Sequence, residues 1–320
     1  MDIKGEILRK IKLSQNILIN IHKSPDYDSF SSALSLRYFL RKLGKKATVI
    51  SCQKINRHFH FLEGAKNIKV INYSKFDFSP YDLFIIPDTA TMERVTGSVE
   101  IKLPKGIDYI VIDHHQTNEI GYPLRLVESR SSATAEVLFD LFDKWRVKID
   151  PRLATLLLAG ILGDTVFLRF CEDRKKTMET VLQLVRKGAD MDFLSEKFFE
   201  DYAFNLVRAV GYFLINLKRE KNFLWSAMDF ETYKKFGQPE GVREMAADNF
   251  FRGVRGVGYG VAILETKKGV VNMSFRSKKK VDVTKYAKLF GGGGHKNAAG
   301  ATILASYDEA IKKIRTTLSG

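Results

Sequence analysis

Residues 108–118 read DYIVIDHHQTN, and this stretch decides the kind of fold to expect. Its first half is a short apolar run, which predicts a buried β-strand. The run stops at Asp113, His114 and His115, so one carboxylate and two imidazoles stand side by side where the strand ends. Such groups at a strand end are typical of a functional site in an α/β protein, provided that others accompany them.

Short β-rich runs alternate with helical patterns in the first half of the chain. The segment 29–44 carries apolar residues at helical spacing and ends in Gly44, which predicts a helix with a glycine stop. Strands that alternate with helices indicate βαβ units and a parallel sheet. The expected strands are 16–22, 46–51, 67–72, 81–88 and 108–115.

The pattern changes twice further along the chain. From residue 131 to 187 it is helical, and residues 192–219 continue as apolar, helix-like sequence. Runs typical of antiparallel strands follow. We therefore predict an α/β protein with a mainly parallel-sheet domain at 1–190, a helical linker at 191–218 and a smaller α/β domain at 219–320.

The composition narrows the classes of function. The 320 residues include 52 Lys and Arg against 37 Asp and Glu, and the net charge of +15 suits a nucleic-acid binder or an enzyme of phosphate esters. A basic surface that serves only solubility is the plain alternative. Cys52 and Cys171 form no CxxC motif, which argues against a zinc ribbon. No apolar run is long enough to span a membrane, so we expect a cytoplasmic protein without membrane attachment.

Other acids and a histidine occupy similar places in the chain. His22, Asp26 and Asp28 follow the first expected strand, Asp88 follows another, and Asp164 ends an apolar helix. Ligands of parallel sheets bind outside the carboxyl ends of the strands, so one crevice could gather these groups. Carboxylates and imidazoles without thiolates suit Mn²⁺ or Mg²⁺, and two such ions could activate a water and hold a phosphoryl group.

Each of these residues also has a plain structural explanation. His22 could end its strand without any ligand, and Asp26 or Asp28 could be a turn residue or a helix N-cap. Asp88 follows a proline and could belong to a turn, and Asp164 could merely end its helix. Four such clusters in one half of the chain favour the common site.

The motifs, in their order, resemble those of a known superfamily. They are HKSPDYDSFSS at 22–32, PDTA at 87–90, DHH at 113–115, GDT at 163–165 and GGGGHKNAAGA at 291–301. This set resembles the DHH–DHHA1 phosphoesterase superfamily, and within it the nanoRNase/pAp phosphatase family (bifunctional oligoribonuclease and PAP phosphatase). The resemblance covers nearly the whole chain and implies a DHH domain followed by a DHHA1 domain. Tyr27 is a departure, because family members often carry a smaller residue there.

The resemblance implies two Mn²⁺ ions in the DHH domain, with Mg²⁺ or Co²⁺ as substitutes. The implied ligands are His22 and Asp26 for one ion, Asp28, His114 and Asp164 for the other, and Asp88 as a bridge between them. Asp113 would support the site, and His115 would face the scissile phosphate.

The glycine run at 291–294 suggests a second binding element. Glycines let a backbone approach a ligand closely, and amides at the N-terminus of a following helix would suit a phosphate. Alone, such a run is more often a flexible loop. The resemblance implies that this domain holds the nucleotide through Arg276, Gly292, Gly293, Gly294 and His295.

The expected function is therefore that of a metal-dependent phosphodiesterase and phosphatase. Its expected substrates are short oligoribonucleotides and 3′-phosphoadenosine 5′-phosphate. The alternatives are a stand-alone cyclic-dinucleotide phosphodiesterase, a RecJ-like single-strand exonuclease, a pyrophosphatase or polyphosphatase, and a nucleic-acid binder without catalysis. The apolar helices at 192–219 either form a homodimer interface or pack between the domains.

Overall fold

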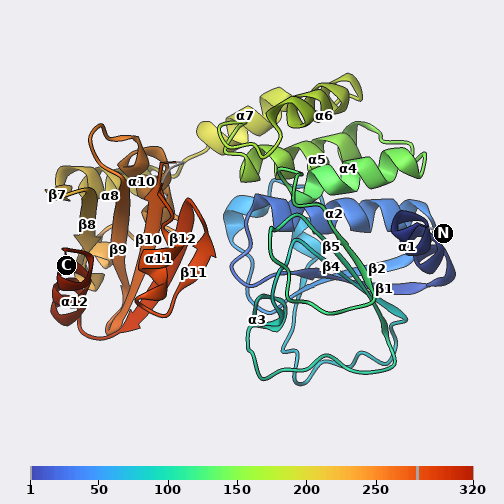
Figure 1. The fold of residues 1–320 in the computed structure, drawn as a ribbon, viewed down its shortest axis with the longest axis horizontal. Helices are drawn as coiled ribbons and strands as arrows, with labels where there is room; N and C mark the ends of the chain where they lie inside the picture. The colour runs from blue at the N-terminus through green and yellow to red at the C-terminus, as the bar shows by residue number, and fades with distance from the viewer. Residues whose placement is uncertain (1, 279–280, 320) are drawn as a thin grey trace. The chain divides into compact units, whose positions relative to one another are not determined.

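The computed structural model describes residues 2–278 and 281–319, except for the side chains of His295 and Ser319. The chain divides into two compact units, Met1–Glu200 and Asp201–Gly320. Each unit has its own sheet and its own hydrophobic cores (Figure 1). Within the described residues, no helix is both long enough and apolar enough to cross a membrane.

The first unit is built on a parallel sheet of six strands, which confirms the fold class expected from the sequence. Their order is β3-β2-β1-β4-β5-β6. The strands are β1 (Asn16–Ile21), β2 (Lys46–Ser51), β3 (Lys69–Val70), β4 (Leu83–Pro87), β5 (Asp108–Asp113) and β6 (Leu124–Val127). The three strands whose ends carry the acids and histidines, β1, β4 and β5, are therefore neighbours at the centre of the sheet.

Helices cover one face of this sheet, as Figure 1 shows for α2, α4 and α5. Ile17 and Ile19 of β1 pack into the core beneath these helices, whereas Leu18 packs into a second core on the opposite face with Val95 of α3. This alternation explains why the strands read as unbroken apolar runs, since both faces are buried. The helices are α1 (Ile3–Leu13), α2 (Tyr27–Lys42), α3 (Met92–Thr96), α4 (Thr134–Lys144), α5 (Pro151–Asp164), α6 (Arg174–Arg186) and α7 (Met191–Phe199), with short 3₁₀ turns at Arg57–Phe59 and Ala65–Asn67.

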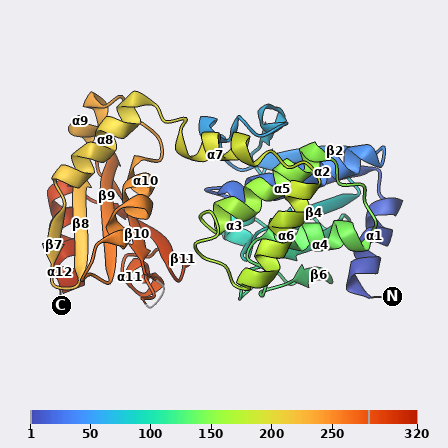
Figure 2. The ribbon, with the colours of Figure 1, turned by 90° about the horizontal axis from the view of Figure 1, so that it is seen from above.

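The second unit is a mostly antiparallel sheet of six strands with helices on both faces (Figure 2). The strand order is β11-β12-β10-β9-β8-β7, and β8 pairs with β9 in parallel. The strands are β7 (Lys218–Glu220), β8 (Phe223–Met228), β9 (Tyr259–Lys267), β10 (Val270–Ser277), β11 (Gly293–His295) and β12 (Ala298–Leu304). The helices are α8 (Phe204–Ile215), α9 (Phe230–Lys235), α10 (Val242–Asn249), α11 (Thr284–Lys288) and α12 (Tyr307–Ser319), with a 3₁₀ turn at Phe251–Gly253.

Several boundaries differ from those expected. The strand expected at 67–72 is reduced to Lys69–Val70. The helix expected at 29–44 begins earlier, at Tyr27, so Asp28 lies in the first turn of α2. The apolar sequence at 192–219 forms two helices, α7 in the first compact unit and α8 in the second. The domain boundaries at 190 and 218 stay predictions, and so does a homodimer.

The glycine run is not followed by a helix, so the expected helix N-terminus is wrong. Residues Gly293–His295 form β11, which pairs with β12 in an antiparallel hairpin. A Cβ atom on Gly292 would lie 2.1 Å from the carbonyl oxygen of Gly300, and one on Gly294 would lie 2.6 Å from that of Ala298. Glycine is needed here because the two backbones approach too closely for any side chain.

Candidate metal centre

His22 directly follows β1 and is completely buried. Its Nδ1 lies 2.9 Å from the carbonyl oxygen of Lys23, which can only accept a hydrogen bond, so Nδ1 carries the proton. The lone pair of Nε2 is then available on the side of Asp26 and Asp88, whose carboxylate oxygens lie 3.8 and 3.5 Å away. Burial lowers the pKa of His22 to about 4, which keeps the ring neutral, as a metal ligand must be.

Asp26 serves as the N-cap of α2 and also faces His22. Its Oδ1 accepts a hydrogen bond of 3.0 Å from the backbone N–H of Ser29, and its Oδ2 is the atom near His22. The cap interpretation of this residue is correct. It does not exclude a second role, because one carboxylate oxygen is still directed to the histidine.

Asp28 is buried in the first turn of α2 and is held by the N-terminus of α4. The backbone N–H groups of Thr134 and Ala135 donate to its two oxygens at 2.5 and 2.9 Å, and the Ser32 hydroxyl donates to Oδ1 at 3.1 Å. Burial nevertheless raises the pKa of Asp28. The helix N-terminus fixes this carboxylate while supplying partial positive charge to it.

Asp88 follows β4 and lies between two histidines. Its Oδ2 lies 3.5 Å from Nε2 of His22, and its Oδ1 lies 3.6 Å from Nε2 of His114. The hydroxyl of Thr134 donates to Oδ1 at 3.1 Å. Its backbone is in the left-handed region, with φ of 51°, which costs energy in a residue other than glycine. Burial and the neighbouring Asp28 raise the pKa of Asp88 well above its usual range.

His114 follows β5 and completes a second group with Asp28 and Asp164. Its Nε2 lies 3.4 Å from Oδ2 of Asp164 and 4.0 Å from Oδ2 of Asp28. Burial opposes protonation of His114, but these carboxylates outweigh it and raise the pKa of the ring. Burial also raises the pKa of Asp164, to about 7. Asp164, the last residue of α5, therefore belongs to this group as well as ending its helix.

Asp113 and His115 form a separate pair beside this set. Asp113 is completely buried, and its Oδ1 lies 2.7 Å from Nδ1 of His115, while Asn118 donates to its Oδ2 at 2.7 Å. Burial would raise the pKa of Asp113, but the hydrogen bonds from His115 and Asn118 lower it overall. An ionised Asp113 accepts a hydrogen bond from Nδ1–H of His115 and fixes the orientation of that ring.

The structure thus brings the predicted set together in groups that could hold divalent metal ions. His22, Asp26 and Asp88 form one group, and Asp28, His114 and Asp164 another, with the potential ligand atoms of each group within 4.8 Å of one another. A third group contains Asp88, His114 and His115. Burial is the largest cause of the raised pKa values of Asp28, Asp88 and Asp164, and a further cause is repulsion between the neighbouring carboxylates. Cations would relieve it, and donors of oxygen and nitrogen without sulfur suit a hard or borderline divalent ion.

Several residues that shape this centre were not singled out from the sequence. Thr134 contacts both Asp28 and Asp88. Gly160 of α5 lies so close that a Cβ there would be 2.9 Å from Oδ1 of Asp28. Small residues inside an apolar helix are the one sequence signal for such a close approach. Gly163 likewise leaves room for Tyr27, because a Cβ atom added to Gly163 would lie 2.3 Å from the Cβ of Tyr27.

Tyr27 itself packs away from the carboxylates among aromatic rings. Its ring centroid lies 4.2 Å from that of Phe198 and 5.1 Å from that of Phe59. The aromatic core and Gly163 therefore accommodate the unusual residue between Asp26 and Asp28.

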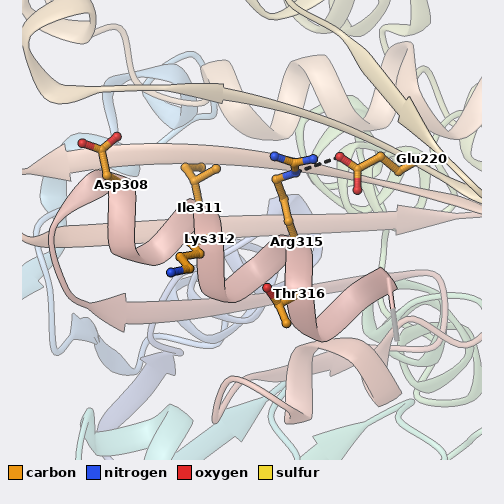
Figure 3. A pocket seen from close by; sticks show the side chains of 6 residues that line it. All are labelled: Glu220, Asp308, Ile311, Lys312, Arg315 and Thr316. Carbon is orange, nitrogen blue, oxygen red and sulfur yellow. Dashed lines mark hydrogen bonds and ion pairs between the residues drawn. The ribbon is translucent and has the colours of Figure 1, made fainter.

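The predicted substrate residues of the second unit have partners within that unit. Arg276 donates from Nε to Asp248 at 2.7 Å, and Asp248 also accepts from Arg252 at 2.9 Å. The side chain of His295 lies outside the described residues. A shallow hollow on this unit is lined by Glu220, Asp308, Ile311, Lys312, Arg315 and Thr316 (Figure 3). An ion pair of 2.8 Å between Arg315 and Glu220 crosses it, and its lining contains no histidine, so it offers no comparable chemistry.

Two family models match the chain. The N-terminal domain of the DHH family matches residues 16–161, and the DHHA1 domain matches residues 230–320. The chain belongs to the DHH–DHHA1 family. The resemblance inferred from the motifs is thereby confirmed, and the protein is a hydrolase of phosphoester bonds. The residues of the candidate metal centre lie within the range that the DHH model matches, except for Asp164, which lies just beyond it.

Several named proteins are similar to nearly the whole of this chain. The bifunctional oligoribonuclease and PAP phosphatase NrnA of Bacillus subtilis is 26% identical over 96% of this chain and 95% of its own. The cyclic-di-AMP phosphodiesterase GdpP of the same organism is 27% identical over 94% of this chain, which corresponds to 47% of GdpP. A solved structure of an exopolyphosphatase-related protein from Bacteroides fragilis has the same fold, with a TM-score of 0.89, 24% identity, and coverage of 99% of this chain and 95% of that one.

Proposed function

We propose that the protein is a two-metal, Mn²⁺-dependent phosphodiesterase and phosphatase that degrades short oligoribonucleotides and removes phosphate from 3′-phosphoadenosine 5′-phosphate. The similarity to NrnA over nearly the full length of both chains supports the choice of substrates. Mg²⁺ and Co²⁺ are the expected substitutes for Mn²⁺.

The observation that carries the two-metal proposal is the position of Asp88. One of its oxygens lies 3.5 Å from Nε2 of His22 and the other lies 3.6 Å from Nε2 of His114. A carboxylate placed in this way can serve two ions at once. His22 and Asp26 would complete the ligands of one ion, and Asp28, His114 and Asp164 those of the other.

Two ions held there would supply a water of lowered pKa and neutralise charge on the phosphoryl oxygens. The side chains supply the rest. Asp113 holds His115 in one orientation, with Nδ1 donating to it, and Nε2 of His115 would contact the scissile phosphate or deliver a proton to the leaving oxygen. Burial of the aspartates strengthens every electrostatic interaction at the centre.

The second unit is proposed to bind the nucleotide. The family resemblance implies this role for five residues, which are Arg276, Gly292, Gly293, Gly294 and His295. The hydrogen bond between Arg276 and Asp248 supports it, because a guanidinium fixed through Nε keeps a preorganised set of donors for phosphate or for stacking on a base.

A cyclic-dinucleotide phosphodiesterase is the second candidate. It is favoured by the similarity to GdpP, which extends over 94% of this chain. The same metal centre could serve both substrates, so the choice requires a direct comparison of turnover.

The test is a substrate panel at fixed Mn²⁺ concentration with the wild-type protein, His114→Ala and His60→Ala. His60 is an exposed histidine that belongs to none of the metal-binding groups, so it is a matched control. The panel contains an RNA dinucleotide, a longer RNA, 3′-phosphoadenosine 5′-phosphate, cyclic di-adenylate and pyrophosphate.

We expect rapid turnover of the dinucleotide and of 3′-phosphoadenosine 5′-phosphate, abolished by His114→Ala and retained by His60→Ala. Turnover led by the cyclic dinucleotide would reject the short-RNA assignment in favour of the second candidate. If no substrate were turned over in a way that depends on His114, the two-metal mechanism itself would be wrong.

A further inference from the structure

Arg94 lies beside the candidate metal centre, between the PDTA motif at 87–90 and the DHH motif at 113–115. It is on α3, the short helix that follows Asp88 and β4. Its carbonyl oxygen accepts a hydrogen bond of 2.7 Å from the backbone N–H of Lys23, the residue after His22. This bond ties the helix to the end of β1 and fixes where the Arg94 side chain starts.

The guanidinium of Arg94 contacts the His22 ring. Its Nη2 lies 3.2 Å from Nε2 and 3.3 Å from Nδ1 of the imidazole. Because Nδ1 already donates to the Lys23 carbonyl, and because Nη2 is almost equally far from both ring nitrogens, the guanidinium lies across the ring rather than in line with one lone pair. Nε2 therefore still faces Asp26 and Asp88, and a metal ligand role for His22 is compatible with this contact.

Arg94 makes no ion pair within 4.0 Å with any carboxylate in the described part of the chain, even though four aspartates surround His22 and His114. It is half-buried, so its charge is poorly solvated. A half-buried guanidinium without an acidic partner is suited to an anion from outside the protein.

An ion held by His22, Asp26 and Asp88 would place a second positive charge next to Arg94. Two neighbouring cations repel each other unless an anion contacts both, and a phosphoryl group with several charged oxygens can do so. We propose that Arg94 binds an oxygen of the reacting phosphate from the His22 side of the centre. This inference rests on the proposed function, and it adds a phosphate-binding residue to the metal ligands.

The test compares Arg94→Ala and Arg94→Lys with the wild-type protein. Glu93→Ala is the matched control, because Glu93 is the preceding residue of the same helix and its side chain is 52% exposed in a surface ion pair with Lys23. Three quantities are measured: Mn²⁺ affinity by calorimetry without substrate, inorganic phosphate affinity in the presence of Mn²⁺, and KM and kcat for a dinucleotide and for 3′-phosphoadenosine 5′-phosphate.

We expect Arg94→Ala to weaken phosphate binding roughly 10- to 100-fold, as for the loss of a hydrogen bond to a charged group. Arg94→Lys should recover part of this loss. Mn²⁺ affinity should stay the same or increase, because a neighbouring positive charge is removed. Glu93→Ala should match the wild-type protein in all three measurements.

Loss of Mn²⁺ affinity in step with loss of phosphate affinity would overturn the inference, because Arg94 would then only support His22. Unchanged phosphate affinity would overturn it as well. An equal rise in KM for both substrates supports contact with the reacting phosphate. A rise confined to 3′-phosphoadenosine 5′-phosphate would assign Arg94 to the second phosphate of that substrate and reject the contact proposed here.

Failure of the proposed function can be told apart from failure of this inference. If the wild-type protein hydrolyses neither substrate, the function is wrong, and the direct phosphate titration still decides whether Arg94 binds the anion. If the wild-type protein hydrolyses both and Arg94→Ala does so with unchanged KM, only the inference is wrong.

Discussion

The Nδ1 atom of His115 lies 2.7 Å from Oδ1 of the completely buried Asp113. The two residues belong to the same short motif, yet they have different surroundings. Asp113 is the last residue of β5 and turns into the protein, where Asn118 donates to its other oxygen. The pair thus fixes one ring nitrogen of His115, while the neighbouring His114 is directed to Asp28 and Asp164.

Asp113→Asn tests the role of this pair. The amide is nearly isosteric but cannot hold His115 through a charged hydrogen bond, so we expect kcat to fall roughly 10- to 100-fold, as for loss of a partner that orients a catalytic or ligating histidine. Mn²⁺ affinity and KM should change little. A fall in Mn²⁺ affinity of the same size would show that Asp113 acts on the metal ligands instead.

Removal of metal tests the two groups that share Asp88. The chelated protein should be inactive, and Mn²⁺ should restore activity and raise the free energy of unfolding by about 2.7 kcal/mol per site at a hundredfold excess over Kd. Asp88→Asn should lose both effects, and calorimetry should show fewer than two bound ions.

The chelated Asp88→Asn protein should nevertheless be more stable than the chelated wild-type protein at pH 7. The substitution removes one of several buried carboxylates that repel one another, and burial together with the neighbouring Asp28 raises the pKa of Asp88 well above its usual range. The control His60→Ala should gain the same stability from Mn²⁺ as the wild-type protein. Equal stability of the two chelated proteins would argue against a destabilising repulsion between Asp88 and the neighbouring carboxylates.

The pKa of Asp164 predicts how stability changes with pH in the chelated protein. Burial raises this pKa from 3.8 to about 7 in the folded state. Above the ordinary pKa the unfolded chain ionises and the folded protein does not, so this group makes the protein less stable as pH rises from about 4 to about 7, by roughly 1.4 kcal/mol per pH unit.

Asp164→Asn removes that dependence. Relative to the variant, the chelated wild-type protein should lose roughly 2 to 3 kcal/mol between pH 5 and pH 7, measured by urea denaturation. Comparison with the variant cancels the contribution of His22, whose lowered pKa changes stability in the opposite direction. A difference that is constant across this range would contradict the raised pKa.

Gly160→Ala tests the packing of α5 against Asp28. In an ordinary helix interior this change stabilises the protein by up to about 1 kcal/mol. Here the new Cβ would lie 2.7 Å from that of Ala135 and 2.9 Å from Oδ1 of Asp28, so we expect a loss of roughly 1 to 3 kcal/mol from overpacking, and weaker Mn²⁺ binding.

Gly211→Ala in α8 is the matched control, because nothing lies within 4 Å of its added Cβ. It should be neutral or stabilising in thermal unfolding. A destabilisation of equal size in both variants would show that helix propensity and local strain, rather than contact with Asp28, explain the result.

Much of the site followed from the sequence because its parts stand at the ends of strands. An unbroken apolar run predicts a strand buried on both faces, and the alternation of such strands with helices predicts a parallel sheet. In a parallel sheet the carboxyl ends of β1, β4 and β5 lie at one edge, which brings His22, Asp88 and His114 to the same place. These candidate metal ligands could therefore be expected to lie together before any coordinates were known.

Contacts that join distant segments could not be predicted in this way. The backbone N–H of Thr134 that holds Asp28 is 106 residues away from it, and Arg94 is 72 residues from His22. The glycine motif forms a hairpin with β12 rather than a helix N-terminus, because glycine in the sequence signals freedom of the backbone and not which backbone approaches it. Burial patterns are local properties of a sequence, so the sequence by itself determined most of the strands and helices and the candidate ligands at their ends. Only tertiary packing decided which amides, side chains and glycines surround each ligand, because those neighbours depend on how whole elements meet in space.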